Sequence, residues 1–152
     1  MTVPFQWANA ELGRVYVAAY QGRRARLCLA INPGTLTRNS TTAQWDAAEI
    51  AGQAGEGYAR VEWTIPAGAY SNTTADFRSP VQLATFLADA DGLGLQWDSV
   101  YLVLGTLSGG VTTWDTNIAG YYPEAPTIAL SPSQPRSYNV QLITDDIITI
   151  SG

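Results

Sequence analysis

The sequence contains no histidine and no lysine, and Cys28 is its single cysteine. A serine, threonine or cysteine nucleophile usually passes its proton to an adjacent base, most often histidine, which this chain cannot supply. A glycine-rich phosphate loop also cannot end in its usual lysine here. These absences predict that the protein is not an enzyme and that it uses no cofactor.

Because Cys28 is alone, no disulfide can form within the chain, which excludes a disulfide-stapled scaffold. It lies in the apolar run 27–31, where a lone cysteine usually behaves as a small buried hydrophobic residue. The N-terminus lacks the charged and apolar regions of a signal peptide, and no apolar run approaches the length of a membrane span. We therefore expect a protein that is made in the cytoplasm and has no membrane anchor.

Charge is also scarce, since charged residues make up 14% of the chain. All eight basic residues are arginines and the net charge is −5, which argues against binding to nucleic acid. A surface with few charges suits packing against another protein, although a neutral-surfaced monomer has the same composition. The one basic cluster contains Arg23, Arg24 and Arg26. It is interpreted first as a solvated turn and strand start, and second as a patch for an acidic partner.

Runs of β-forming residues separated by glycine, proline and asparagine predict the fold class. A hairpin is expected around Gly22, between strands at 14–20 and 24–31. The most apolar run, within 98–106, predicts a central strand buried on both faces. Further strands are expected at 58–65, 74–78, 81–87, 111–118, 126–130 and 138–150. The pattern predicts one all-β domain over residues 1–152, a β-sandwich or a jelly-roll-like barrel, with one short helix in a long loop.

The long loop spans residues 35–57, and a loop of this length in a compact domain tends to be functional. Within it, residues 43–50 predict one or two helical turns, with Thr41 or Thr42 as the cap. Trp45 lies in this helix and is the best candidate for an exposed aromatic anchor.

Two further aromatic positions are distinguished by their surroundings. Tyr121 and Tyr122 precede a proline in an expected loop and form the second candidate anchor. Trp63 alternates with Val61 and Ile65 on one face of a strand, which predicts a core position.

Two groups of carboxylates suggest chemistry but do not satisfy its requirements. Asp145 and Asp146 are adjacent, so in a strand they point to opposite faces and cannot converge on one cleft. Asp89 and Asp91 resemble the start of a calcium loop, but Val100 occupies the position where that loop needs glutamate. The sequence therefore predicts no metal site.

Four short motifs occur in an order that resembles a known group of proteins. Tyr16-Val17-Ala18 is followed by Glu49-Ile50-Ala51-Gly52, then Gly57-Tyr58-Ala59-Arg60, and later by Gln96-Trp97-Asp98-Ser99-Val100-Tyr101-Leu102. Over roughly residues 14–115 their order and spacing resemble small β-rich virion structural proteins of tailed bacteriophages, which include capsid cement or decoration proteins and tail-fibre-like proteins. The resemblance implies a location in the virion, other virion proteins as partners (the major capsid protein or tail subunits) and a homo-oligomer, either dimer or trimer.

Glu49 and Arg60 are the pair in this stretch with a physical role. A bidentate ion pair between them could hold the long loop on the sheet, whereas a solvent-exposed arginine would contribute little. The candidate interface and structural residues are Trp45, Glu49, Tyr58, Arg60, Tyr121, Tyr122, Arg23 and Arg24.

Three functions remain open at this point. A capsid cement protein predicts a broad interface with few charges. A tail-fibre or baseplate subunit predicts a trimer with an exposed aromatic tip. A carbohydrate-binding module predicts tryptophan or tyrosine side chains aligned on one face.

Overall fold

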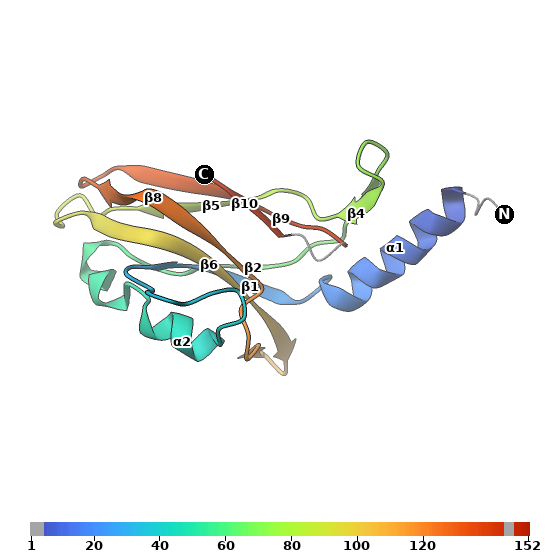
Figure 1. Ribbon diagram of the computed structural model, residues 1–152, viewed down its shortest axis with the longest axis horizontal. Helices are drawn as coiled ribbons and strands as arrows, with labels where there is room; N and C mark the ends of the chain where they lie inside the picture. The colour runs from blue at the N-terminus through green and yellow to red at the C-terminus, as the bar shows by residue number, and fades with distance from the viewer. Residues whose placement is uncertain (1–4, 145–147) are drawn as a thin grey trace.

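The structure is a computed structural model that describes residues 5–144 and 148–152. It is a mostly-β, sandwich-like fold in which every paired strand is antiparallel (Figure 1). The first sheet contains β1 (Arg24–Ala30), β2 (Val61–Thr64), β6 (Leu95–Ser108), β7 (Val111–Trp114) and β8 (Gly120–Leu130). The second contains β5 (Gln82–Leu87), β9 (Pro135–Leu142) and β10 (Ile148–Ser151), and β3 (Ala69–Ser71) pairs with β4 (Asp76–Arg78).

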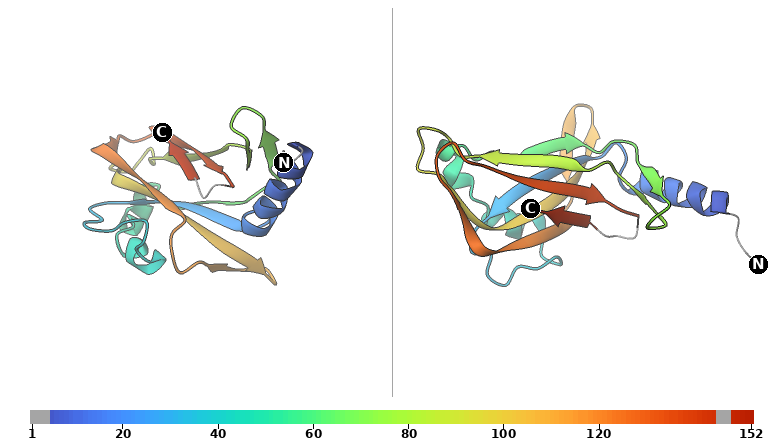
Figure 2. Two further views of the ribbon diagram at one scale, coloured as in Figure 1. Left: turned by 45° about the vertical axis from the view of Figure 1, so that its right-hand side comes forward. Right: turned by 90° about the horizontal axis from the view of Figure 1, so that it is seen from above.

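The strand order explains why the all-β prediction holds without a closed barrel. The first sheet runs β2-β1-β6, and β7 and β8 both pair with β6, while the second runs β10-β9-β5. No ladder joins β2 to β5 or β8 to β10 among the described residues. The two sheets therefore face one another with their edges unjoined, as the two views of Figure 2 show.

The central strand β6 is buried on both faces, which confirms the prediction for residues 98–106. Its inner face contributes Val100, Leu102 and Leu104 to the core between the sheets. Its outer face contributes Tyr101 and Val103 to a second cluster, which is covered by the segment between β1 and β2. Burial on both faces gives β6 the near-continuous apolar sequence that distinguishes it from the alternating strand β5.

The expected strand at residues 14–20 is wrong, because this segment belongs to the helix α1 (Phe5–Ala19). Tyr16 and Tyr20, four residues apart, are both buried, and the Tyr16 ring lies 5.3 Å from the ring of Phe77 on β4. Gly13 lies on the same face, where a Cβ would lie 3.3 Å from the Phe77 ring. Helical spacing of the two tyrosines therefore outweighs the β-propensity of the Val15-Tyr16-Val17 run, and no hairpin forms around Gly22.

The helix α1 extends from one end of the sandwich and packs mainly on the β3–β4 hairpin (Figure 1). Two shorter helices, α2 (Thr42–Ala47) and the 3₁₀ helix η1 (Ala51–Glu56), lie in the long segment between β1 and β2. The short helix expected at 43–50 in the long loop is therefore present as α2, and the structure adds α1 and η1, which the sequence did not predict. Among the described residues, no helix combines the length and apolar character needed to cross a membrane.

Most of the other expected strands are present with shifted ends. The strands predicted at 58–65, 74–78 and 81–87 correspond to β2, β4 and β5, and the run 138–150 is divided between β9 and β10. The strand expected at 111–118 ends at Trp114, and the strand expected at 126–130 begins earlier, at Gly120. Asp145 and Asp146 lie outside the described residues.

Candidate interaction site

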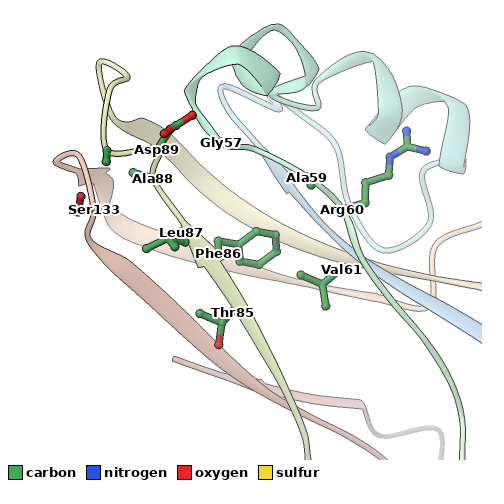
Figure 3. A pocket seen from close by; sticks show the side chains of 11 residues that line it. Gly57, Ala59, Arg60, Val61, Thr85, Phe86, Leu87, Ala88, Asp89 and Ser133 are labelled. Atoms are coloured by element: carbon green, nitrogen blue, oxygen red, sulfur yellow. The ribbon is translucent and has the colours of Figure 1, made fainter.

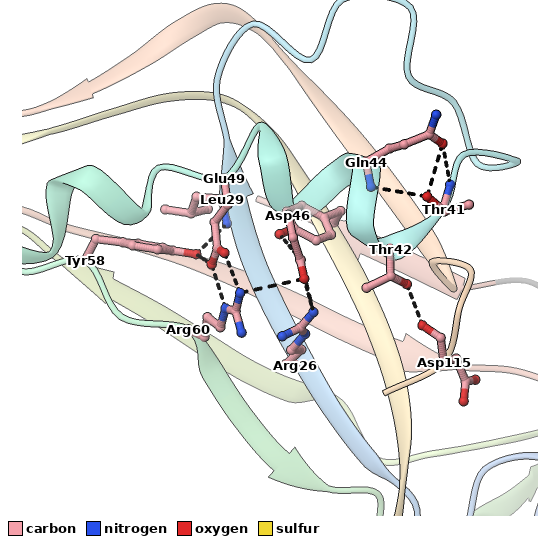
Figure 4. A network of polar contacts seen from close by, with 11 residues as sticks. Arg26, Leu29, Thr41, Thr42, Gln44, Asp46, Glu49, Tyr58, Arg60 and Asp115 are labelled. Atoms are coloured by element: carbon pink, nitrogen blue, oxygen red, sulfur yellow. Dashed lines mark hydrogen bonds and ion pairs between the residues drawn. The ribbon is translucent and has the colours of Figure 1, made fainter. Parts of the chain in front are cut away.

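The segment 31–60 lies on the outer face of the first sheet and is tied to the rest of the fold by backbone hydrogen bonds. Ile50 N–H donates to the Leu29 carbonyl of β1 over 3.0 Å, and within the segment Ile31 N–H donates to the Ala48 carbonyl over 3.0 Å. In the middle, Thr42 donates its N–H to Thr116 O over 2.7 Å and its hydroxyl to Asp115 O over 2.6 Å. The segment is therefore an integral layer of the fold (Figure 4).

The helix α2 begins at the cap that the sequence predicts. The Thr41 side chain accepts a hydrogen bond from Gln44 N, and the Gln44 side chain accepts one from Thr41 N over 2.9 Å. This reciprocal capping box satisfies two helix-end donors that would otherwise lack partners. It sets the rotation of α2, so that Trp45 faces the sheet.

Trp45 is fully buried, which overturns its prediction as an exposed anchor. Its ring packs 5.3 Å from Tyr101 and 5.2 Å from Tyr121, and its Nε1 donates to Thr37 O over 3.0 Å. The buried Cys28 lies in the same cluster, where burial raises the pKa of its thiol to about 12. Trp45 is thus the anchor of α2 on its own sheet.

Asp46, a residue of α2, contacts three side chains from three other parts of the chain. Its carboxylate accepts a hydrogen bond from Arg26 Nη2 at 2.8 Å and one from the Tyr101 hydroxyl at 2.7 Å, and Arg60 Nη2 lies 3.8 Å away. The Arg26 guanidinium also lies 4.7 Å from the centre of the Trp114 ring. Arg26 is only 2% exposed, so its charge depends on Asp46 for compensation.

The predicted bidentate pair of Glu49 and Arg60 is present. Arg60 Nε donates to Glu49 Oε1 over 2.8 Å and Nη2 donates to Oε2 over 2.6 Å. The Glu49 side chain is 3% exposed and that of Arg60 is 36% exposed. The hydrogen bonds to Glu49 raise the pKa of Arg60, so its guanidinium remains protonated.

Tyr58 completes this network from the core side. Its hydroxyl donates to Glu49 Oε1 over 2.5 Å and accepts from the Leu29 N–H over 3.2 Å. Burial, followed by the neighbouring Cys28 and the hydrogen bond to Glu49, raises the pKa of Tyr58. The motif residues Glu49, Tyr58 and Arg60 thus form one structural unit that fixes the long segment to β1.

The remaining predicted site residues lie elsewhere. Arg23 pairs with Asp115 over 2.6 Å, and Arg24 pairs with Glu62 over 3.3 Å, so neither presents an uncompensated charge to a partner. Tyr121 and Tyr122 belong to β8 and pair with β6, which overturns their assignment to a loop. Tyr121 packs against Trp45 with its ring tilted, and Tyr122 packs against the inner core.

The arginines as a group are used for internal ion pairs. Seven of the eight have an acidic partner, and Arg38 is the only one without one among the described residues. The seven are Arg14, Arg23, Arg24, Arg26, Arg60, Arg78 and Arg136. Within the described part of the chain, no group of three or more metal-ligating side chains could hold a metal ion. Positive charge therefore stabilises this fold and is largely unavailable to an anionic partner.

Two elements carry exposed apolar side chains away from the sandwich, and nothing in the sequence distinguished them as surface features. On α1, Val15 is 41% exposed and Val17 is 53% exposed. The β6–β7 hairpin continues past the last residue of β6 that pairs with β1, Gly105, and exposes Leu107 and Val111 near its tip. Residues 105–114 contain no charged side chain. These two elements, α1 and the hairpin, are here called the projecting elements.

A groove lies at the end of the sandwich that is farther from α1, between β5 and the chain that leads into β2 (Figures 1 and 3). Its volume is about 590 Å³, and its lining includes Ala59, Val61, Thr85, Phe86 and Asp89. By contrast, no aligned aromatic surface of the kind that binds sugars is present, since Tyr121 alone among the described aromatic side chains is exposed.

Comparison with known proteins finds no match, whether among protein-family models, curated proteins or solved structures. The resemblance to virion proteins therefore rests on the four short motifs, and each of the four supplies a buried side chain of this fold: Tyr16, Glu49, Tyr58, and Trp97 with Tyr101.

Proposed function

We propose that this chain is a non-enzymatic structural protein of a tailed-bacteriophage virion, a decoration protein that packs on capsid subunits and stabilises the head. The observation that carries the proposal is the contrast between the arginines, which are consumed in internal pairs, and the projecting elements, which are apolar and exposed. Protein interfaces are depleted of charge at their centre, so such elements suit contact with another protein.

The partner class comes from the resemblance, and the fold is compatible with it. A decoration protein binds a surface that is already assembled, so it needs a rigid body and exposed docking elements. The network of Glu49, Tyr58 and Arg60 rigidifies the body, because it holds the 31–60 segment against β1. The helix α1 and the hairpin β6–β7 both extend away from the sandwich, and they supply exposed apolar surface (Figure 1).

Localisation on purified particles tests the proposal. We expect a reconstruction, or immunogold labelling, to place the chain on the outside of the head. Label confined to the tail would instead identify a tail-fibre or baseplate subunit, and particles without the chain would overturn a virion role altogether.

A variant with an added charge tests whether the projecting element α1 contacts the capsid. Val17→Glu places a carboxylate on the exposed face of α1, and we expect it to reduce the amount of the chain in particles, measured by mass spectrometry. Leu93→Glu is the matched control, since Leu93 is 91% exposed in the turn before β6, outside both projecting elements. Equal incorporation of the two variants would exclude α1 as a docking element.

A further inference from the structure

Each of the two sheets has an edge strand beside the same groove. Among the described residues, β2 pairs only with β1, and β5 pairs only with β9. Where the strands approach, Asp89 N–H donates to the Glu56 carbonyl over 2.9 Å. At this point a Cβ on Gly57 would lie 2.7 Å from both Asp89 N and Leu87 O. The edges of the two sheets are therefore in contact at Gly57, which is called the sealed end of the groove, and no ladder joins β2 to β5 further along in the described residues.

The registers show which backbone groups face the unsealed side. Ile65 N–H donates to Arg23 O over 2.8 Å, so Val61 and Trp63 direct their peptide groups toward β1, and those of Glu62 and Thr64 point away. By the same reasoning, the bond from Ala88 N–H to Gln134 O places the peptide groups of Leu83 and Thr85 away from β9.

Most of these outward peptide groups have no protein partner in the described part of the chain. The exception on β5 is the Leu83 carbonyl, which accepts from the Gln82 amide over 3.1 Å. Edge strands in natural proteins are commonly protected by proline, charge or a covering element. In β5 the sequence Gln82-Leu83-Ala84-Thr85-Phe86-Leu87 offers none of these protections. The edge is thus suited to pairing with an added strand.

The groove beside these edges has an apolar floor. Phe86 and Ala88 are 3% and 1% exposed, and Val61 is half-buried beside them. Thr85, Leu87 and Ala59 form exposed walls, as Figure 3 shows for the labelled side chains. An extended peptide has alternating side chains, so every second one would face this floor.

The charge at the groove is negative at its sealed end. The Arg60 guanidinium is directed away from the floor and bonds to Glu49 (Figures 3 and 4). Asp89 lines the groove, and Glu56 and Asp91 are the sequence neighbours of the lining residues Gly57 and Ala90. None of these three carboxylates has an arginine partner among the described residues. A complementary ligand therefore carries a positive charge at this end.

We propose that the groove between β5 and the chain that leads into β2 binds an extended segment of a partner subunit, which adds a strand to the open edge of β5. The segment has apolar side chains at alternate positions and a lysine or arginine beside Asp89. Recognition of this kind takes its affinity from main-chain hydrogen bonds and its specificity from alternate side chains. The inference rests on the proposed function, because it supposes a second subunit, but its chemistry can be tested on the isolated chain.

Fluorescence anisotropy with short labelled peptides tests this inference. The probes alternate threonine and valine and carry one arginine, placed at either end because the direction of the added strand is open. We expect one of the two to bind, the same peptide with glutamate in place of arginine to bind about tenfold more weakly, and a peptide N-methylated at alternate positions not to bind. Absence of binding by both arginine peptides would overturn the proposal.

Two variants, Ala59→Trp and Asp89→Asn, test whether the peptides bind in the groove, and a third, Ala51→Trp, is the control. Ala59→Trp fills it from an exposed wall and should abolish binding, whereas Ala51→Trp, on exposed η1 outside the groove, should not. Asp89→Asn should remove the preference for arginine over glutamate and leave the fold intact. Equal binding by Ala59→Trp and the unaltered chain would overturn the assignment.

Sedimentation of the isolated chain tests the other possible occupant of the groove, which is a second copy of this chain. A dimer that Ala59→Trp dissociates would show that the groove is a self-interface and would overturn binding of a different subunit. Failure of the peptides to bind, with the chain present on the head, removes the groove alone. Peptide binding by a chain absent from particles removes the virion function alone.

Discussion

The Glu49 carboxylate is nearly inaccessible to solvent and has three hydrogen bonds from two side chains, Tyr58 and Arg60. A buried carboxylate is costly without such partners, and removal of one partner leaves the remaining charge uncompensated. The pair was predictable from sequence because Arg60 follows Glu49 across glycines, a spacing that permits return of the chain. The participation of Tyr58, Asp46 and Arg26 in this network was not predictable from the sequence, since it depends on which residues of β1 face outward.

At this scale we predict the effect of Arg60→Ala. The substitution should lower the free energy of unfolding by about 2–3 kcal/mol, below the full cost of breaking a buried pair because Arg60 is partly exposed. Chemical denaturation measures this change. Arg24→Ala is the control, since its pair with Glu62 is more exposed on the acidic side and should contribute about 1 kcal/mol or less. Equal losses in the two variants would contradict a special role for Glu49.

Among the elements, α1 and the segment 31–60 show where sequence patterns were ambiguous. Val15-Tyr16-Val17 has the composition of a strand, and the contacts that favour the helix are those of Tyr16 with Phe77 and of Tyr20 with Ile143. Trp45 was correctly placed in a short helix, but the face of the helix that meets the sheet is set by the turn at Thr41 and could not be read from residue type. By contrast, β6 was clear because burial on both faces leaves a long apolar run.

The junction between η1 and β5 supports a prediction about Gly57. This residue has φ +98° and lies against the backbone of Leu87 and Asp89, so Gly57→Ala adds both an unfavourable conformation and a backbone clash. We expect a loss of about 2–4 kcal/mol in the free energy of unfolding. Gly22→Ala is the control, because Gly22 also has positive φ, +79°, but has open space around it. A loss no greater than that of Gly22→Ala would show that the junction can relax.

On the scale of the whole molecule, both hydrophobic layers are lined by tyrosines whose ionisation opposes folding. Burial raises the pKa of Tyr16 to about 12, and it also raises the pKa values of Tyr58, Tyr101 and Tyr138. Tyr101 belongs to the outer cluster and Tyr138 to the core between the sheets. Both layers therefore favour the neutral phenol.

This predicts a cooperative alkaline transition. A pKa raised on folding contributes stability that is complete below the pKa of the unfolded chain, about 10, and is lost as the pH rises from there through the folded value. We expect the phenolate absorbance of these buried tyrosines to rise together with the loss of far-ultraviolet circular dichroism, in one transition above about pH 10. Ionisation of these tyrosines while the circular dichroism stays native would contradict their burial.

The pairing of arginines with carboxylates within the fold also affects the electrostatic repulsion between copies of this protein. With seven cations each held against a carboxylate, the long-range field of the molecule is that of its surplus acids, and the net charge is −5. Neighbouring copies on a shared surface therefore repel beyond the reach of their apolar contacts, over about 10 Å at moderate ionic strength. Dissolved cations would reduce this repulsion, so the density at which copies can cover a surface becomes a function of the salt around them.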